Sequence, residues 1–430
     1  MQNNSTQVIR PVRSLQGSIR LPGDKSISHR YAMLGSIAEG DTKIENYSTG
    51  ADCASTLGCI RGLGVQWERD SGKIVIHGKG SQLQAPKESL DCGNSGSTIR
   101  MLSGILAGQN FTTELFGDES LSKRPMARVI TPLESMGAKI SSKDGGRPPL
   151  RITGGRLKAI EYNMPVPSAQ VKSCLLHAGL YADGETKITE SIRTRDHGEV
   201  ALRAFGAEVK RNGTQVSIAG GQKLKAIEAI VPGDISSSAF FLCAAALFPG
   251  SQLTITHLLM NPTRARLFDI LISMGLKINL TQVEEHHGEL VGTAQAEGNS
   301  LRGVVLSSGD SAALIDEIPV LAAIAPYTEE GIEIRDAKEL RVKESDRIAS
   351  VATNLRAMGA EVEEREDGLK IRGKQKLHGA DINSFHDHRI AMAFAIAALR
   401  AEGETTIRGA DAAVISFPAF YNTLEAIVER

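Results

Sequence analysis

Six short stretches of the chain place polar residues immediately before an apolar helical pattern, and four of the six are rich in Ser, Asn, Gly and basic residues. Helix N-termini expose unpaired N–H groups and the positive end of the helix dipole, so they bind anions well. For a single helix, capping explains a Ser or Asp at this place. Repetition with added Lys or Arg favours a shared anionic ligand. In chain order the stretches read GDKSISHR (23–30), CGNSGSTIR (92–100), PSAQVKS (167–173), GDISSSAF (233–240), LIDEIPV (314–320) and HDHRIAM (386–392).

A second set of helix starts carries further basic side chains. Lys343 and Arg347 are four residues apart in one of them, so we expect them to share a helix face. Glu344 then points elsewhere, unless the chain there is not yet helical. Alone, such a segment is usually a solvated helix surface, but beside the other basic starts, in a chain of formal net charge −1, it indicates a cationic cleft. The set comprises KRPMARV (123–129), TRDHGEV (194–200), NPTRARL (261–267) and LRVKESDRIAS (340–350).

Two neighbouring carboxylates, Asp316 and Glu317, open a predicted helix. Adjacent side chains diverge on a helix, so a paired acid/base dyad is not expected. We expect one carboxylate to cap the helix and the other to face the cleft. A carboxylate surrounded by cations stays ionised, which makes it a candidate general base.

Metal, nucleotide and thiol chemistry have weaker signals. The segments FHDHR (385–389) and VEEHHGE (283–289) contain His pairs, but neither has the spacing of a third zinc ligand, so no metal is expected. The chain lacks the GxxxxGK[ST] phosphate-binding loop. Cys92 lies beside the GNSGST turn without an evident base, so a buried thiol is expected.

Glycines reveal a repeat. The glycines of one series each end a helical run that precedes a strand. The glycines of a second, interleaved series each end an Ala- and Leu-rich helix. A left-handed C′ position explains why Gly occurs in both series. The spacing predicts six α/β units of about 70 residues, three in each half. The first series is Gly64, Gly137, Gly206, Gly275 and Gly359, and the second is Gly40, Gly108, Gly184, Gly250, Gly331 and Gly403.

The same Pro-Gly-Asp turn occurs at 22–24 and at 232–234, close to half the chain apart. We interpret the two turns as crossings between two lobes. One lobe comprises residues 23–231, and the other comprises residues 1–22 with 232–430. Two crossings side by side would form a hinge.

Bulk composition excludes several classes of protein. The 430 residues are 41% hydrophobic and 23% charged, as in a soluble globular protein. A net charge of −1 gives no global field for nucleic acid or an anionic membrane. No apolar run is long enough to span a bilayer, and the five Cys are scattered, so we expect a cytoplasmic protein with reduced thiols. No apolar seam can be read from the sequence, so a monomer is expected.

Taken together, these motifs resemble those of the EPSP synthase family, from about residue 14 to the last helix. The resemblance implies two lobes, each an inside-out α/β barrel of three βαβαββ units. It also implies transfer of the enolpyruvyl group of phosphoenolpyruvate to the 5-hydroxyl of shikimate 3-phosphate, without a metal or organic cofactor. The motifs are LPGDKSISHR, GNSGSTIR, SLSKRPM, PSAQVKS, TRDH, VPGDISS, IDEIP, LRVKESDR, DHRIAM and SFP.

The resemblance also implies roles for individual residues. In catalysis, Asp316 takes the 5-hydroxyl proton, Glu344 delivers a proton to the methylene carbon, and Lys25 assists. Contacts to shikimate 3-phosphate are implied for Lys25, Ser26, Arg30, Ser168, Ala169, Gln170, Arg195, Asp316 and Lys343. Contacts to phosphoenolpyruvate are implied for Lys25, Gly96, Arg124, Gln170, Arg347 and Arg389, with Asn94 and Arg100 supporting that loop.

One position departs from part of the family. Some members carry a Lys before the C-terminal TFP as a further phosphoenolpyruvate contact, whereas this chain has Ile415, as in a second branch. Two alternatives remain at this point. The related transferase acting on UDP-N-acetylglucosamine typically has a loop Cys, which the SLSKRPM region lacks. A non-catalytic anion-binding scaffold would not need Asp316 and Glu344.

Overall fold

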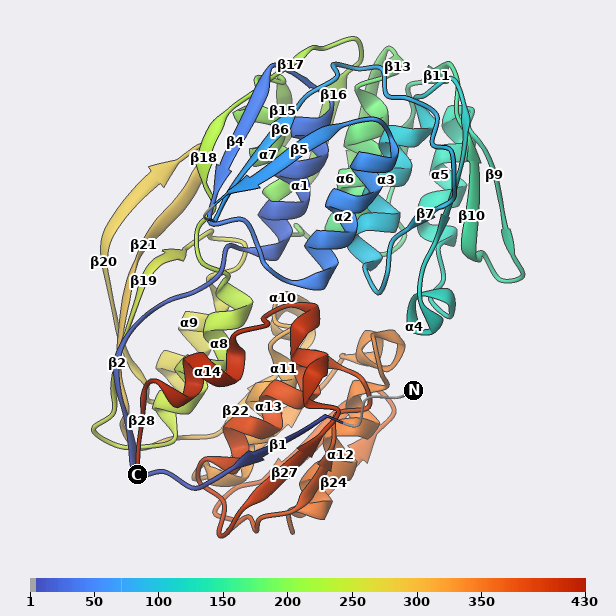
Figure 1. The fold of residues 1–430 in the computed structure, drawn as a ribbon. Coiled ribbons are helices and arrows are strands. Elements are labelled where there is room, and N and C mark those ends of the chain that lie inside the picture. The colour runs from blue at the N-terminus through green and yellow to red at the C-terminus, as the bar shows by residue number, and fades with distance from the viewer. Residues whose placement is uncertain (1–4, 71) are drawn as a thin grey trace. The chain divides into compact units, whose positions relative to one another are not determined.

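The computed structural model describes residues 5–70 and 72–430 (Figure 1). The chain divides into two compact units. The middle unit comprises Gly23–Val231 and the short segment Glu285–Glu289, and the terminal unit comprises the residues up to Pro22, Pro232–Glu284 and Leu290–Arg430. The sequence had placed 285–289 with the terminal residues. This segment instead groups with the middle unit, because Glu289 contacts His197 there.

The middle unit is built from three similar α/β repeats. Each repeat contributes to a four-stranded sheet in which one edge strand is parallel to its neighbour and the other two strands form an antiparallel hairpin. The sheets are β18 (Glu228–Ile230), β4 (Asp41–Glu45), β6 (Lys73–His77), β5 (Gln66–Asp70); β7 (Leu90–Asp91), β8 (Thr112–Phe116), β10 (Arg147–Thr153), β9 (Lys139–Lys143); and β12 (Glu161–Asn163), β14 (Glu185–Thr189), β16 (Gln215–Ala219), β15 (Val209–Asn212). Two-stranded sheets pair β17 (Leu224–Lys225) with β3 (Ala38–Glu39) and β11 (Leu157–Lys158) with β13 (Ala182–Asp183).

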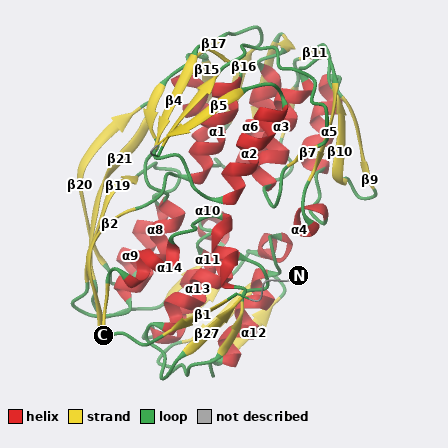
Figure 2. Cartoon of the chain, in the orientation of Figure 1, coloured by secondary structure: helices red, strands yellow, loops and turns green. Residues whose placement is uncertain are grey.

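Helices fill the interior of the middle unit, and the sheets surround them (Figure 2). The three inner helices are almost wholly buried, whereas the outer hairpin strands β5 and β9 are largely exposed. This is the inside-out arrangement, because each sheet buries only its helix-facing side. The inner helices are α1 (Lys25–Ser36), α3 (Gly96–Ala107) and α6 (Ala169–Gly179), and the others are α2 (Ala51–Gly62), α4 (Glu119–Ser122), α5 (Ala127–Met136) and α7 (His197–Ala204).

The terminal unit has a similar arrangement, and two strands from the N-terminus take part in its sheets. Strand β2 (Ser14–Arg20) joins one sheet parallel to β19 (Gln252–Leu259), and β1 (Thr6–Ile9) joins another antiparallel to β27 (Thr405–Arg408). The first sheet also contains β20 (Lys277–His286), β21 (Glu289–Glu297) and β28 (Val428–Glu429), and the second contains β26 (Asp381–Asn383). A third sheet consists of β22 (Val304–Leu306), β23 (Gly331–Ile334), β25 (Gly368–Arg372) and β24 (Val362–Arg365).

Three inner helices also form the core of the terminal unit. Every residue of α8 (Ile235–Ala246), α11 (Ile318–Ile324) and α13 (His388–Ala398) is buried, and the three helices contact one another. The remaining helices are α9 (Arg266–Ser273), α10 (Ser308–Ala313), α12 (Arg347–Ala357) and α14 (Phe420–Glu425), with 3₁₀ turns η1 (Ala325–Tyr327), η2 (Lys338–Val342) and η3 (Ala410–Ile415). All six polar stretches identified in the sequence therefore precede or open an inner helix.

The glycine series predicted the repeat correctly but one backbone conformation wrongly. All the glycines of both series have positive φ except Gly108, whose φ is −86°. A Cβ at Gly108 would lie 2.3 Å from Cγ of Tyr181. Glycine is thus required there by the approach of an aromatic ring and not by a left-handed turn.

Across residues 5–70 and 72–430, no helix combines the length and the apolar character needed to cross a membrane.

Candidate active site

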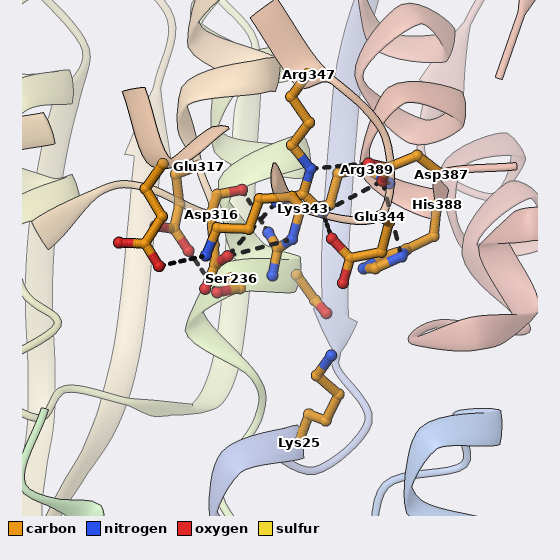
Figure 3. A network of polar contacts seen from close by, with 12 residues as sticks. Lys25, Ser236, Asp316, Glu317, Lys343, Glu344, Arg347, Asp387, His388 and Arg389 are labelled. Atoms are coloured by element: carbon orange, nitrogen blue, oxygen red, sulfur yellow. Dashed lines mark hydrogen bonds and ion pairs between the residues drawn. The ribbon is translucent and has the colours of Figure 1, made fainter. Parts of the chain in front are cut away.

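Arg347 is the centre of a polar network in the terminal unit (Figure 3). Its side chain is 1% exposed at the first turn of α12, and three carboxylates surround it. Its Nε lies 2.8 Å from Oδ2 of Asp387, its Nη2 lies 2.6 Å from Oε2 of Glu344, and its Nη1 lies 3.6 Å from Oδ1 of Asp316. Burial alone would lower the pKa of Arg347, but these carboxylates outweigh it and raise the pKa. The guanidinium is therefore permanently charged.

Asp316 lies in the turn before α11, beside a second guanidinium. Arg389 donates from Nη1 to the carbonyl oxygen of Asp316 at 2.6 Å, and its Nε lies 4.0 Å from the Asp316 carboxylate. The Asp316 side chain keeps 20% of its surface exposed. The carboxylate thus stands next to two cations and still reaches solvent, which suits a group that accepts a proton from a ligand.

The expectation that one of the two neighbouring carboxylates caps α11 is wrong. Glu317 occupies the N-cap position, but its side chain makes no capping hydrogen bond. Instead it accepts a hydrogen bond from Ser236 of α8 and lies 3.6 Å from the Arg264 guanidinium. This carboxylate is buried among partners of its own, so it joins α8 to the turn before α11.

Lys343 and Arg347 do not share a helix, contrary to the sequence prediction. The 3₁₀ turn η2 ends at Val342, and α12 begins only at Arg347. The physical reason is the Asp346 N-cap, whose side chain accepts from the Ala349 N–H at 3.0 Å and so starts the helix there. In the intervening segment Glu344 accepts a hydrogen bond from Arg347.

The ammonium of Lys343 stands in a partly desolvated place. Its Nζ lies 3.9 Å from Oε1 of Glu339. Burial lowers the pKa of Lys343, and the nearby Asp316 and Glu339 carboxylates oppose this only in part. A poorly hydrated cation is well suited to bind an anion or a hydroxyl.

Asp387 is a residue of the network that the sequence analysis missed. It is buried, it receives both the Nε and Nη2 of Arg347, and Ser345 donates to its Oδ2 at 3.1 Å. Its Oδ1 also accepts the N–H of Arg389 at 2.9 Å, which caps α13. Burial would raise the pKa of Asp387, but Arg347 more than offsets this and the pKa is lowered. The sequence signal for Asp387 was its place directly before the helix in the stretch HDHR. The sequence analysis interpreted that stretch through its His and Arg residues.

In the middle unit, Lys25 begins α1. Asp24 caps that helix by accepting the Ile27 N–H at 2.9 Å. The Lys25 ammonium lies 2.8 Å from Oδ2 of Asp52, whose side chain is 7% exposed. Asp52 was not among the candidate residues, since it opens the helix 51–62 without a basic neighbour in sequence.

A second group of side chains joins the N-termini of α3 and α6. Arg100 donates to Oε1 of Gln170 at 2.8 Å, and Gln170 donates in turn to Oγ of Ser97 at 2.9 Å. Arg124 donates to Oδ1 of Asn94 at 2.9 Å. A Cβ at Gly96 would lie 2.8 Å from Nη1 of Arg100 and 3.2 Å from Nη1 of Arg124. Glycine at this helix start therefore leaves room for both guanidiniums.

Arg30 and Arg195 form a third cationic group of the middle unit. Arg30 is buried and donates to Oγ of Ser173 and to the carbonyl oxygen of Ser26, both at 2.8 Å. Burial lowers its pKa to about 10, and the positive charge of Arg195 acts in the same direction. An anion bound beside these two guanidiniums would relieve their repulsion.

The remaining candidates lie at the start of α6. Ser168 caps this helix by accepting the Val171 N–H, and the carbonyl oxygen of Ala169 accepts from Ser173 at 2.8 Å. Capping therefore explains the side chain of Ser168 in this structure. Gln170, one residue further on, contacts the α3 start instead.

The weaker sequence signals can also be located. Cys92 is buried, and a hydrogen bond with Cys59 together with burial raises its pKa well above the usual value, as for a structural thiol. His286 and His287 are exposed at a hairpin turn. Within residues 5–70 and 72–430, no cluster of three or more His, Cys, Asp or Glu side chains could hold a metal ion.

Comparisons with known proteins identify first the fold and then the family. The enolpyruvyl transferase NikO from Streptomyces tendae shares the fold, with a TM-score of 0.80 at 19% identity over 99% of this chain and 98% of that one. A 2.37 Å structure of EPSP synthase from Acinetobacter baumannii gives a TM-score of 0.87 at 42% identity over 98% of both chains.

Sequence relatives agree. The 3-phosphoshikimate 1-carboxyvinyltransferases of Koribacter versatilis and Solibacter usitatus are 61% and 57% identical over 98% of this chain and 99% of each relative. The profile of the family described as EPSP synthase (3-phosphoshikimate 1-carboxyvinyltransferase) matches residues 9–424. The chain belongs to the EPSP synthase family.

Proposed function

We propose that the three cationic groups of the middle unit and the Arg347 network of the terminal unit bind the two substrates of one reaction. The reaction itself follows from the family. The protein transfers the enolpyruvyl group of phosphoenolpyruvate to the 5-hydroxyl of shikimate 3-phosphate, releasing phosphate, as a step of the shikimate pathway. The assignment of individual residues to the two substrates is our proposal.

The charge of the substrates supports this assignment. Together they bring two phosphate and two carboxylate groups into one site, and several fixed cations must offset their repulsion. Shikimate 3-phosphate is assigned to Lys25, Ser26, Arg30, Ser168, Ala169, Gln170, Arg195, Asp316 and Lys343. Phosphoenolpyruvate is assigned to Lys25, Gly96, Arg124, Gln170, Arg347 and Arg389.

The proton transfers are assigned to two carboxylates. Glu344 delivers a proton to the methylene carbon of phosphoenolpyruvate, which leaves C2 electron-poor. Asp316 takes the proton of the 5-hydroxyl as its oxygen attacks C2. The tetrahedral intermediate then loses phosphate: Glu344 takes a proton back from the methyl carbon, the C2–CH₂ double bond re-forms as the C2–O bond to phosphate breaks, and the proton held by Asp316 leaves with the phosphate. The observation that carries this assignment is that Asp316 and Glu344 both lie beside one buried guanidinium, at 3.6 and 2.6 Å from Arg347.

The substitution Asp316→Ala tests the base. Because the cations that hold the anions remain, we expect both substrates to bind within about threefold of the wild-type affinity, while kcat falls by at least about 100-fold. Calorimetry measures the binding, and phosphate release measures the turnover. Asp310→Ala is the control, because Asp310 of α10 lies 2.6 Å from Arg266 and is assigned neither to a substrate nor to a proton transfer. An unchanged kcat for Asp316→Ala would remove Asp316 from the base role.

Phosphate release also separates the related alternatives. Release from phosphoenolpyruvate is expected with shikimate 3-phosphate and not with UDP-N-acetylglucosamine. A non-catalytic scaffold would give release with neither.

We further propose that the protein acts as a cytoplasmic monomer and belongs to the branch with Ile415 in place of a C-terminal Lys. A sedimentation measurement that gives a dimer would contradict the proposed oligomeric state.

A further inference from the structure

Four charged side chains form a buried cluster in the middle unit, apart from the residues assigned to substrate. Lys172 of α6 lies 3.0 Å from Glu190 and 3.1 Å from Glu199. Arg211 of β15 contacts the same two carboxylates, at 2.9 Å from Glu190. The Lys172, Glu190 and Glu199 side chains are at most 1% exposed. Two cations and two anions are therefore balanced inside the protein.

Such a cluster is a costly way to fill a core. Taking charges out of water costs several kcal/mol per ion, and well-packed apolar residues often stabilise a fold better. Burial would raise the pKa of Glu190, but Lys172, Thr194 and Arg211 outweigh this effect and lower it, so Glu190 remains ionised. Stability of the fold alone does not explain why an ionised carboxylate is kept here.

Glu190 differs from Glu199, the other carboxylate of the cluster, because it also holds a loop. Its Oε2 accepts the backbone N–H of Thr194 at 2.9 Å and the hydroxyl of the same residue. Lys172 donates to the Thr194 carbonyl oxygen at 3.5 Å. Three polar groups of Thr194 are thus bonded to the buried cluster, whereas residues 191–193 of the loop are exposed. The next residue along the chain is Arg195.

The position of Arg195 needs such an anchor. Its charge disfavours the protonated form of the nearby, buried Arg30, and like charges in a partly desolvated place repel each other. Before the anion binds, a mobile loop would let Arg195 move away from Arg30 and lose the paired arrangement. A loop fixed at Thr194 keeps both guanidiniums in place in advance, which lowers the entropy lost on binding.

We propose that Glu190 is a positioning residue for the phosphate group of shikimate 3-phosphate. It acts through Thr194, whose backbone it fixes so that Arg195 stands beside Arg30. This inference rests on the proposed role of Arg195 as a phosphate ligand. It adds a residue that touches no substrate, and it explains why the charged cluster lies under this loop.

The substitution Glu190→Gln tests the proposal, with Glu199→Gln as its matched control. Either change removes one carboxylate from the same two cations, but only Glu190 holds Thr194. An amide in place of the Glu190 carboxylate can accept from Thr194 only by turning its NH₂ toward Lys172 and Arg211, which are donors themselves. We expect Glu190→Gln to raise KM for shikimate 3-phosphate at least about tenfold, with kcat and KM for phosphoenolpyruvate within about twofold. Glu199→Gln is expected to leave all three within about twofold.

The sign of the effect separates positioning from simple electrostatics. The Glu199 carboxylate is one of the charges that act on Arg30, so electrostatics alone would make Glu199→Gln tighten phosphate binding. Loss of the Glu190 charge would act in the same direction, because it also removes a negative charge from the unit that holds Arg30. Weaker binding in Glu190→Gln only is therefore a signature of lost positioning. Equal effects of the two substitutions on KM for shikimate 3-phosphate would overturn the proposal.

Two further variants keep the test decisive if Glu190→Gln does not fold. Thr194→Val leaves all four charges in place and removes only the hydroxyl bond to Glu190; we expect KM for shikimate 3-phosphate to rise about threefold. Arg195→Ala is expected to raise the same KM at least about tenfold. If Arg195→Ala has this effect and neither Thr194→Val nor Glu190→Gln changes the KM, the positioning role is refuted while the phosphate role stands. An unchanged KM in Arg195→Ala refutes both.

Discussion

At the level of single residues, the proposed site depends on cations that are paired with buried carboxylates. Arg347 is almost fully buried, and its pKa is raised only because carboxylates surround it. Lys25 is held by Asp52 in a similar way at 2.8 Å. Breaking a buried pair leaves an uncompensated charge, which typically costs about 3–5 kcal/mol. The partner carboxylates Asp52 and Asp387 are therefore as important to the site as the cations they hold.

Lys343 leads to a prediction about pH. Its folded-state pKa is lowered by burial, so the ammonium loses its proton below the usual value of about 10.4. Below that lowered pKa the cation is present and available to the anionic substrate; above it the cation is lost. We expect kcat/KM for shikimate 3-phosphate to fall on the alkaline side, at a lower pH than an ordinary lysine would give.

The variant Lys343→Arg tests this assignment, because an Arg stays protonated throughout the accessible range. Its alkaline limb should move to higher pH, even if the maximum activity is lower. The measurement is a pH profile of kcat/KM in each protein. An alkaline limb at the same pH in both proteins would show that another group is responsible.

At the level of helices and strands, the N-terminus of a helix supplies both a cap and a cation. Asp24 and Asp346 are N-caps, and Lys25 and Arg347 follow them directly. The cap fixes where the helix begins, so the next side chain leaves the first turn in a defined direction. This explains why the sequence motif pairs an acid with a base in DK and DR, although the acid does not contact the substrate in our proposal.

The close approach of the inner helices α3 and α6 gives a second prediction. A Cβ at Gly104 would lie 2.0 Å from the carbonyl oxygen of Cys174, a backbone atom that cannot turn aside. Gly104→Ala should therefore separate the helices and lower the free energy of unfolding by about 3 kcal/mol. Gly58→Ala in α2 is the control, since nothing lies within 4 Å of its Cβ position, and it should stabilise the protein by up to about 1 kcal/mol. Urea denaturation measures the free energy of unfolding of both variants. Equal changes in Gly104→Ala and Gly58→Ala would contradict the packing argument.

At the level of the whole chain, the middle unit is continuous in sequence from Gly23 to Val231, apart from the segment Glu285–Glu289. Its three four-stranded sheets, two two-stranded sheets and three inner helices all come from within this range. The terminal unit, by contrast, combines both ends of the chain, because β1 and β2 complete two of its sheets. The two units should therefore differ in their ability to fold alone.

We expect the fragment 23–231 to unfold cooperatively in urea. It should be less stable than the same unit in the full chain, because His197 loses its 2.7 Å contact with Glu289. The single tryptophan, Trp67, lies in β5, so its fluorescence reports this unit in both proteins. The matched comparison is the substitution Glu289→Gln in the full-length protein, which should lower the free energy of unfolding by part of the same amount. A fragment without a cooperative transition would mean that the middle unit depends on the terminal unit for its core.

The amino-acid sequence alone was sufficient for the repeat and for the starts of the six inner helices, and it supplied most of the residues that the proposal assigns to substrate. These depend on local rules: glycine where the backbone turns left-handed, an acid at a helix cap, and apolar residues at helical spacing. Residue types in the six polar stretches likewise predicted anion binding without any coordinates.

Other features required the folded chain, because they depend on contacts between distant segments. Asp387 meets Arg347 across 40 residues, and Glu289 meets His197 across 92. Nothing in the local pattern distinguishes Gly108, which contacts the Tyr181 ring, from the left-handed glycines of its series. The break between Lys343 and Arg347 was also hidden, since i, i+4 spacing describes a helix only if the helix is present. Long-range packing selects among conformations that local preference leaves nearly equal in energy.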